Sequence, residues 1–495
     1  MPMSRDLLRL ADSVLLPGFQ GTTPPDWLRR RLGEGLAGVV LFSRNIVSPA
    51  QVAELTAALR AENPAVVVAT DEETGEVTRL EVQGGSSRPG SYALGVVDDP
   101  ALTEVIARDL GRDLAAAGVT LDFAPSADVN SNPDNPVIGL RSFGAHADLV
   151  ARHTRAFVRG LQSAGVAACA KHFPGHGDTS VDSHYSVPLV GADIEQALVP
   201  FAAAIAEGVR SIMTGHLLVP SHDPNAPATL SHKVLTGLLR EELGFQGLIV
   251  TDGIEMGAVA GPYGIGGASA RAIAAGADAI CVGGENSDEA TAVSARDTIA
   301  AAVADGLLPE ERLADAARRV AELTAWTTAA RADGPGGHGG DGAHGLAGAR
   351  RAVRVTRRSA APSLPVTTPA QVIELSPEMN LAIDKDTPWG VGEPLAKLLP
   401  GTAVTRLTAQ EAGGPTLERL LAESRDRPLV IVVRDVHRYE WQTAAVTHLL
   451  SGRPDAVVVE MGLPARTDLG AVHIATYGSA AVCGQAAAET ITGTL

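Results

Sequence analysis

Short apolar runs rich in β-branched residues alternate with longer amphipathic segments from about residue 12 to about residue 330. In the amphipathic segments the apolar residues recur at a period near 3.6, which is typical of a helix that packs one face against a sheet. The predicted strands cover residues 13–16, 38–43, 65–70, 120–125, 168–173, 211–216, 247–252 and 279–284. The predicted helices include residues 49–62, 99–118, 147–165, 193–208, 288–306 and 309–332.

This alternation predicts an α/β fold in which a (β/α)8 TIM-like barrel occupies residues 1–332. An open, doubly wound sheet would show the same local pattern and is the alternative. In a barrel, catalytic groups lie at the C-terminal ends of the strands and in the loops that follow them. Polar residues stand at several of these ends, namely Asp71, Asp122, Asp128, Lys171, His172, His216 and Asp252.

The glycine-rich segment "DGPGGHGGDGAHG" interrupts the pattern after residue 332. Such a composition does not hold a packed conformation, so we expect a flexible linker over residues 333–348. We expect its histidines, His338 and His344, to be solvated rather than to bind a ligand. Apolar runs then alternate with helical patterns again, which predicts a smaller α/β sandwich domain over residues 349–495.

The charge and the cysteines exclude several classes of function. The chain has 495 residues, with 57 acidic and 40 basic side chains and a formal net charge of −17, which disfavours binding to nucleic acid. Cys169, Cys281 and Cys483 each lie in an apolar run, so we expect buried thiols rather than disulfides. No run approaches the roughly 18 apolar residues of a membrane span, and the first residues lack a signal-peptide pattern. We therefore expect a cytoplasmic protein with no nucleic-acid or membrane partner, and the oligomeric state is left open.

The segment "LIVTDGIEM" places Asp252 directly after an apolar strand, at the mouth of the predicted barrel. Gly253 would let a substrate approach the backbone closely there. The alternative is that Asp252 caps the next helix, a common position for aspartate. The barrel assignment favours a catalytic carboxylate.

The segment "KHFPGHGDTSVDSH", residues 171–184, is unusually rich in titratable groups. Pro174 ends the strand and the glycines around His176 allow a tight turn, so the following residues lie in a loop able to cover the barrel mouth. Asp182 and His184 are two residues apart, which lets the carboxylate bond one ring nitrogen while the other moves a proton. A solvated loop histidine is the alternative for His184.

The same segment suggests a metal site with His172 and His176 as ligands of zinc or iron. Their spacing of four residues suits a helix, and the Phe-Pro-Gly sequence between them breaks one. We therefore expect no metal.

Arginine side chains mark two further segments. In "NPVIGLRSFG", Arg141 lies among apolar and small residues, where a guanidinium group usually serves a specific acceptor. A structural salt bridge to a strand-end carboxylate is the alternative for Arg141. The segment "TDEETGEVTRL" combines several carboxylates, Asp71 among them, with Arg79.

These segments resemble glycoside hydrolase family 3, and in particular its β-N-acetylglucosaminidase branch of the bacterial cell-wall recycling type. The likeness is carried by "NPVIGLRSFG", "KHFPGHGDTSVDSH" and "TDGIEM", and it spans most of residues 8–330. The part that begins with "TPWGVGEPLAKL" looks like the second domain of the two-domain, Gram-positive-type members.

The resemblance implies a nucleophile at Asp252 and a general acid/base at His184, with Asp182 orienting the imidazole ring. Glu76 stands where relatives commonly carry arginine, which reverses a charge near the barrel rim. The residues implied to bind substrate in the −1 subsite are Asp71, Arg141, Lys171 and His172, with His216 and Met256 at family-like positions.

The implied activity is that of a retaining exo-β-N-acetylglucosaminidase, without a cofactor, acting on muropeptides or chitooligosaccharides. A phosphorylase is one alternative, because a histidine repels phosphate less than a glutamate would. A metal-dependent barrel hydrolase using His172, His176 and Asp252 is an alternative of another class. A sugar-binding protein without activity is disfavoured, since it would not need a nucleophile.

Overall fold

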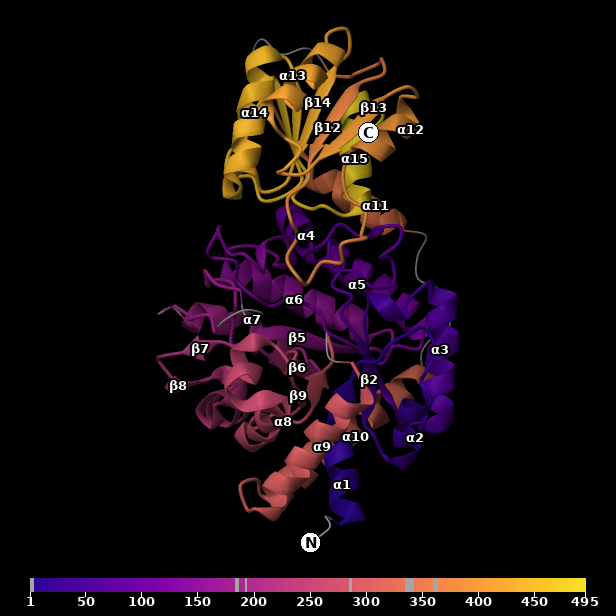
Figure 1. Cartoon of the computed structure of the whole chain (residues 1–495), viewed down its shortest axis with the longest axis vertical. Coiled ribbons are helices and arrows are strands. Elements are labelled where there is room, and N and C mark those ends of the chain that lie inside the picture. Colours follow the sequence, from indigo (N-terminus) through magenta and orange to yellow (C-terminus); the bar gives the residue numbers. More distant parts are fainter. Residues whose placement is uncertain (1–3, 183–186, 192–193, 285–286, 334–341, 359–363) are drawn as a thin grey trace. The chain divides into compact units, whose positions relative to one another are not determined.

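The computed structural model describes residues 4–182, 187–191, 194–284, 287–333, 342–358 and 364–495 (Figure 1). Contacts divide the chain into two compact units. The first unit comprises Met1–Glu73, Pro100–Ile138 and Ser142–Gly340, and the second comprises Thr74–Asp99, Gly139–Arg141 and Asp341–Leu495. Within the described ranges, no helix is both long enough and apolar enough to span a membrane.

Parallel strands form the centre of the first unit. One sheet has the order β2-β3-β4-β5-β6-β9, and β1 pairs with β10. Hydrogen bonds from the Thr251 N–H to the Ala279 carbonyl (3.0 Å) and from the Ala37 N–H to the Asp12 carbonyl (3.1 Å) connect the two sheets at both edges. The (β/α)8 barrel is therefore confirmed. Its strands are β1 (Leu15–Pro17), β2 (Gly38–Leu41), β3 (Val67–Thr70), β4 (Leu121–Asp122), β5 (Ala167–Phe173), β6 (Ser211–Thr214), β9 (Leu248–Thr251) and β10 (Ile280–Val282).

Helices lie outside these strands, and side-chain caps fix where some of them begin. At the start of α3 the Ser48 hydroxyl accepts the Gln51 N–H (3.2 Å), and at the start of α9 the Asp288 carboxylate accepts the Thr291 N–H (2.8 Å). The helices are α1 (Arg5–Asp12), α2 (Asp26–Glu34), α3 (Pro49–Glu62), α5 (Pro100–Ala116), α6 (Ala147–Gln162), α7 (Ile194–Ala206), α8 (Gly257–Ala275), α9 (Glu289–Ala304) and α10 (Glu310–Asp333).

Between β6 and β9 the chain adds elements that the sequence pattern did not predict. They are an antiparallel pair, β7 (Leu218–Val219) and β8 (Asp223–Pro227), and a π-helical segment, Lys233–Glu242.

Apolar side chains from neighbouring strands fill the interior of the first unit, and Cys169 and Cys281 lie among them. Burial raises the pKa of the Cys169 thiol to about 12 and raises that of Cys281 well above its usual value. In the second unit Cys483 is buried in the same way. The prediction of three buried thiols is confirmed.

The second unit is a sheet between two layers of helices (Figure 1). The strand order is β11-β16-β15-β14-β12-β13, and all neighbours are parallel except β11, which runs antiparallel to β16. Alternate residues of the strands pack towards α13 and α14 on one face and towards α11, α12 and α15 on the other. The predicted α/β sandwich is confirmed.

The strands of the second unit are β11 (Arg354–Arg357), β12 (Gln371–Leu375), β13 (Ala403–Leu407), β14 (Leu429–Val433), β15 (Val457–Glu460) and β16 (Val472–Ala475). The helices are α4 (Ser91–Val97), α11 (Ala343–Ala352), α12 (Gly392–Leu398), α13 (Gly414–Glu423), α14 (Glu440–Gly452) and α15 (Ala481–Thr492).

Helix α11 begins inside the stretch for which the glycines suggested a linker, and His344 lies on it. A Cβ at Gly345 would lie 1.9 Å from the Ser87 carbonyl oxygen. This glycine therefore serves close packing rather than flexibility. His338 lies outside the described residues.

Two segments that the sequence placed in the barrel domain join the second unit by their contacts, namely Thr74–Asp99 and Gly139–Arg141. Glu76 explains part of this, because its buried carboxylate pairs with Arg434 and accepts a hydrogen bond from Ser479 (3.2 Å). The Arg79 guanidinium donates to the Ala382 carbonyl (3.0 Å). The charge reversal at Glu76 is thus balanced by Arg434 within the same unit.

Candidate active site

Asp252 is the first residue after β9, on the rim formed by the C-terminal ends of the barrel strands. Its N–H donates to the Thr214 carbonyl at the end of β6 (3.0 Å), and its Oδ1 accepts the N–H of Gly253 (2.8 Å). The residue is partly exposed, so a carboxylate held between two strand ends is open to a ligand. Helix α8 starts later, with Met256 at its N-cap, so Asp252 does not cap that helix. Met256 itself is partly exposed.

His216, in the loop after β6, fixes the peptide that follows Asp252. Its Nε2 lies 2.9 Å from the Gly253 carbonyl oxygen and its Nδ1 lies 2.8 Å from the Thr229 hydroxyl. A carbonyl only accepts, so Nε2 carries the proton. Because His216 is fully buried and both ring nitrogens contact protein groups, it positions the turn after Asp252 in this structure.

Lys171, on β5, joins two carboxylates of the loop after β3. Its Nζ lies 2.6 Å from Asp71 Oδ1 and 2.6 Å from Glu73 Oε1. Lys171 and Glu73 are buried, whereas the Asp71 side chain is 21% exposed. Asp71 is therefore the most exposed member of this cluster.

Asp122, at the end of β4, lies beneath this cluster and accepts the N–H of Glu72 (2.9 Å). Burial raises the pKa of Asp122 well above its usual value, and the nearby Glu72 and Asp71 carboxyl groups add to the rise.

His172 and Asp128 form a buried pair beside Lys171. His172 Nδ1 lies 2.8 Å from Asp128 Oδ2, and the His176 N–H donates to Asp128 Oδ1 (2.7 Å). Burial acts to raise the pKa of Asp128, but the two histidines outweigh it and hold that pKa below its usual value. A carboxylate at Nδ1 fixes the tautomer and the ring orientation, so His172 would meet a sugar hydroxyl through Nε2.

His176 has a structural role in the same loop. Its Nδ1 lies 2.6 Å from the Thr179 hydroxyl, and its carbonyl accepts the Asn135 side-chain N–H (2.7 Å). Across the part of the chain that the structure describes, no three histidine, cysteine or carboxylate side chains gather in an arrangement that would hold a metal ion.

The first residues of the loop that carries the predicted acid/base pair pack closely against neighbouring backbone. A Cβ at Gly177 would lie 1.9 Å from the Val129 carbonyl oxygen, and Asp178 accepts the N–H of Gly191. Asp182 is partly exposed, and His184 lies outside the described residues. The His184–Asp182 pair stays a prediction.

Arg141 belongs to the second unit, where it is buried. Burial raises the pKa of Glu76, and the charges of Arg434 and Arg141 oppose that rise. The Arg141 charge therefore acts on a carboxyl group of its own unit, and its contact with substrate stays a prediction.

Sequence reasoning missed Glu255 and Arg44 at the rim around Asp252. Glu255 accepts the N–H of Gly284, and Arg44 donates to the carbonyls of Gly283 and Gly284. The one signal for Glu255 was its place within "TDGIEM". Arg44 gave no signal, because its partners Gly283 and Gly284 at the rim follow it by about 240 residues.

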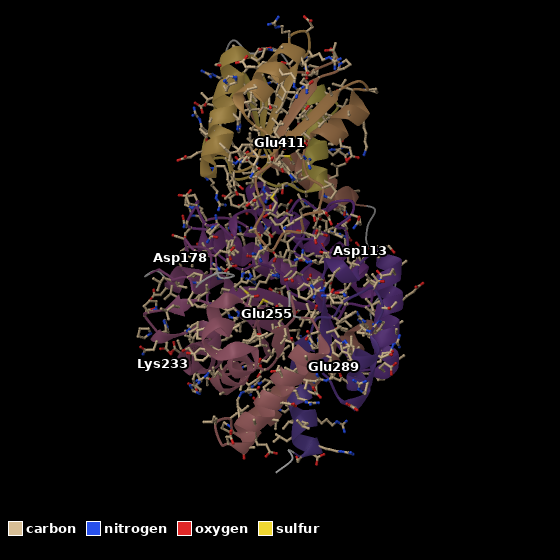
Figure 2. All side chains as sticks on the ribbon, viewed as in Figure 1. Asp113, Asp178, Lys233, Glu255, Glu289 and Glu411 are labelled. Carbon is tan, nitrogen blue, oxygen red and sulfur yellow. The ribbon has the colours of Figure 1, made fainter. Side chains whose placement is uncertain are left out.

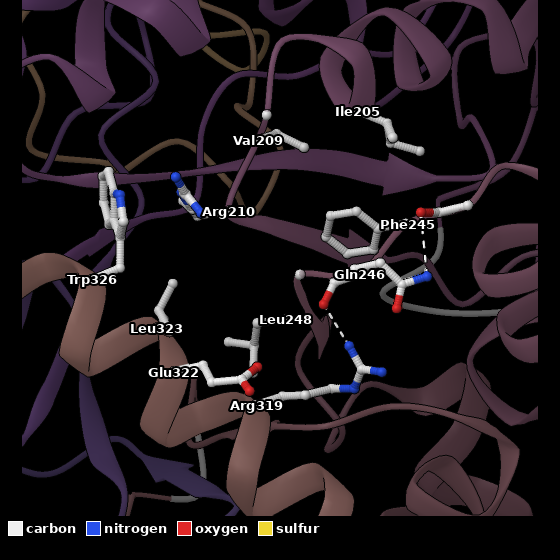
Figure 3. Close-up of a pocket in the computed structure, with 13 residues that line it drawn as sticks. Ile205, Val209, Arg210, Phe245, Gln246, Leu248, Arg319, Glu322, Leu323 and Trp326 are labelled. Carbon is white, nitrogen blue, oxygen red and sulfur yellow. Dashed lines mark hydrogen bonds between the residues drawn. The ribbon is translucent and has the colours of Figure 1, made fainter.

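A cavity of about 320 Å³ opens at the other end of the barrel, where β6 and β9 begin (Figure 3). The Arg210 guanidinium stacks 4.7 Å from the centre of the Trp326 ring there. Catalytic groups of barrels lie at the C-terminal ends of the strands, so this cavity is separate from the candidate site.

Comparison with known proteins identifies similar chains. Residues 29–323 match the family model described as the glycosyl hydrolase family 3 N terminal domain. A curated β-hexosaminidase of Xylella fastidiosa (strain M23) is 37% identical over 284 residues, 54% of this chain and 83% of that protein. β-Hexosaminidase A of Pseudoalteromonas piscicida is 37% identical over 264 residues, 48% of this chain but only 44% of that protein.

One solved structure is similar over almost the whole chain. It is a glycoside hydrolase family 3 β-N-acetylglucosaminidase from Paenibacillus sp. str. FPU-7, with a TM-score of 0.88 and 33% sequence identity. The match covers 99% of this chain and 97% of that chain.

Proposed function

Because the chain belongs to glycosyl hydrolase family 3, we propose that it is a retaining exo-β-N-acetylglucosaminidase that acts through a covalent glycosyl-enzyme. The family match and the curated relatives make it a glycoside hydrolase of the β-hexosaminidase type. The similarity to the Paenibacillus β-N-acetylglucosaminidase supports a substrate that contains N-acetylglucosamine.

The position of Asp252 is the observation that carries the proposal. Asp252 is a partly exposed carboxylate at the end of a strand. Its N–H donates to the Thr214 carbonyl, and the Gly253 carbonyl accepts from His216. These contacts preorganise the carboxylate for attack. Attack of one Asp252 oxygen on the anomeric carbon forms the glycosyl–ester bond while the bond to the leaving oxygen breaks.

The second carboxyl group of most retaining glycosidases is replaced here by a histidine. In the proposal His184 protonates the leaving oxygen and then removes a proton from the water that resolves the glycosyl-enzyme. Asp182 orients the ring and stabilises the imidazolium form. Asp71, Lys171 and the Asp128-bound His172 would bind the hydroxyl groups of the −1 sugar.

Trapping with a 2-fluorinated N-acetylglucosamine analogue, followed by peptide mapping, tests the nucleophile. We expect a stable adduct on the peptide that contains Asp252. An adduct on another residue, or turnover without any covalent species, would overturn the assignment.

The product formed in phosphate buffer separates hydrolysis from phosphorolysis. We expect free N-acetylglucosamine, and release of the sugar 1-phosphate would instead establish a phosphorylase. We also expect full activity after treatment with a chelator, whereas loss of activity that added metal restores would favour the metal-dependent hydrolase. Action on muropeptides or chitooligosaccharides and a cytoplasmic location stay predictions.

A further inference from the structure

Glu255 lies three residues after Asp252, in the turn that joins β9 to α8, and is labelled in Figure 2. The Met256 N–H closes this turn on the Gly253 carbonyl (3.0 Å). Glu255 Oε1 accepts the N–H of Gly284 in the loop after β10. The carboxyl group therefore connects the turn that carries Asp252 to the neighbouring strand end.

Arg44 contacts the same loop through the loop's backbone carbonyls. It follows β2, and its guanidinium donates to the carbonyls of Gly283, Gly284 and Phe19. The Gly284 residue is thus fixed at its N–H by Glu255 and at its carbonyl by Arg44. These contacts join the loops after β1, β2, β9 and β10 into one network at the barrel rim.

Glycines make room for this network. A Cβ at Gly284 would lie 2.8 Å from Glu255 Oε1. A Cβ at Gly18 would lie 2.6 Å from the Gly283 carbonyl oxygen and 2.9 Å from Arg44 Nη2. Any larger residue would displace the groups that hold the loop.

The Glu255 carboxyl group has titratable neighbours, and Asp252 is one of them. The groups that face the carboxyl are Asp252 on its own turn, Arg44 after β2 and Cys281 on β10. Burial raises the pKa of Glu255, and the Asp252 charge adds to the rise. The backbone N–H groups that donate to the carboxyl oppose this rise. Glu255 Oε2 is buried and has no hydrogen-bond partner among the described residues.

We propose that Glu255 is a positioning residue whose carboxyl group holds the Asp252 turn against the loop after β10. This inference rests on the proposed nucleophilic role of Asp252. The Glu255 carboxyl oxygen accepts the hydrogen bond from Gly284 and so fixes the turn that carries the nucleophile.

Two substitutions separate the hydrogen bond from the charge. Glu255→Ala removes the contact with Gly284, and we expect kcat to fall about 10- to 100-fold while KM changes less than about threefold, because a displaced nucleophile affects chemistry more than binding. Glu255→Gln keeps an accepting oxygen without a charge, and we expect it to retain kcat within about threefold of the wild type. The rate of trapping by the fluorinated analogue should fall in parallel with kcat.

Glu289→Ala is the matched control, because Glu289, the first residue of α9, makes an exposed ion pair with Arg30 of α2, and it should leave kcat unchanged. If E255A does not fold, Gly284→Ala tests the same contact with Glu255 in place. Wild-type kcat in E255A or Gly284→Ala, or an E255Q variant as slow as E255A, would overturn the inference. A wild-type protein without hexosaminidase activity would contradict the proposed function instead.

Discussion

Asp252 and Glu460 occupy similar positions in the two units but have different surroundings. Asp252 follows β9 and Glu460 ends β15, so each lies at the carboxyl end of a parallel strand. Asp252 is partly exposed, whereas Glu460 is fully buried. Glu460 accepts the backbone N–H groups of Asp435 (2.8 Å), Val436 (3.2 Å) and Gly462 (2.7 Å).

The difference shows that position at a strand end is not enough to make a carboxylate a candidate nucleophile. Around the barrel rim, Asp252 is partly exposed, and the Lys171–Asp71 ion pair and the His172–Asp128 pair lie on neighbouring strand ends. In the second unit the backbone itself satisfies Glu460, which holds the loops after β14 and β15 together. The first carboxylate is available for chemistry and the second is used for structure.

The largest expected effect is the loss of activity in Asp252→Ala, which distinguishes a chemical role of Asp252 from the structural role of Glu460. Asp252→Ala should lower kcat by roughly 10³-fold or more, because the covalent step loses its nucleophile. Glu460→Gln is the matched control and should keep kcat within about threefold, since the Glu460 carboxyl contacts backbone groups of its own unit. Steady-state kinetics with an aryl N-acetylglucosaminide measures both, and equal losses in the two variants would remove the distinction.

His184→Ala tests whether the acid/base group lies on the loop after β5. We expect losses of about 10²- to 10⁴-fold for substrates with poor leaving groups and much smaller losses for activated aryl glycosides, because only the former need a proton. The ratio of kcat/KM for the two substrate types is the measurement. A uniform loss on both would argue against this role for His184.

Lys171→Met tests the charge cluster that distinguishes the barrel rim. Removing a buried cation leaves Glu73 and Asp71 without their partner, and we expect the free energy of unfolding to fall by about 3 kcal/mol. We also expect KM to rise. Urea unfolding and steady-state kinetics check the two effects, and an unchanged denaturation midpoint would show that the cluster does not stabilise the barrel.

Over any one pH unit, the smallest expected effect is the change in stability of the second unit with pH. Burial and the Asp435 carboxylate raise the pKa of Glu460 to about 8, although the backbone N–H donors act to lower it. The folded form therefore keeps a proton that the unfolded chain releases, so stability falls as the pH rises from about 4.5 to about 8, by at most about 1.4 kcal/mol per pH unit. Glu460→Gln should flatten this dependence in urea unfolding at several pH values. A wild-type curve that rises over this range would contradict the assignment.

Local periodicity in the sequence located most of the barrel. The predicted helix over residues 49–62 coincides with α3, and the predicted strand over residues 247–252 contains β9. These patterns are informative because an element that buries one face repeats its apolar residues at the period of its own backbone. The placement of Asp252 at the rim follows from the same pattern, since it ends an apolar run.

Elements without such a pattern were missed. The strand β8 (Asp223–Pro227) contains two prolines and only one buried residue, so its sequence indicates a loop. Helix α11 was hidden by glycines whose purpose is close packing, as the contact of Gly345 with Ser87 shows. In both cases the reason for the structure lies in a partner segment, not in the segment itself.

The sequence by itself determined the strands and helices, the buried cysteines and the rim position of Asp252, because each depends on the chemistry of a few consecutive residues. Only the tertiary structure decided which charges meet. Glu76 finds Arg434 at a separation of 358 residues, and Glu255 finds Gly284 on another strand end. A carboxylate looks the same in the sequence whether solvent, an arginine or the backbone will surround it, since those partners are brought to it by folding.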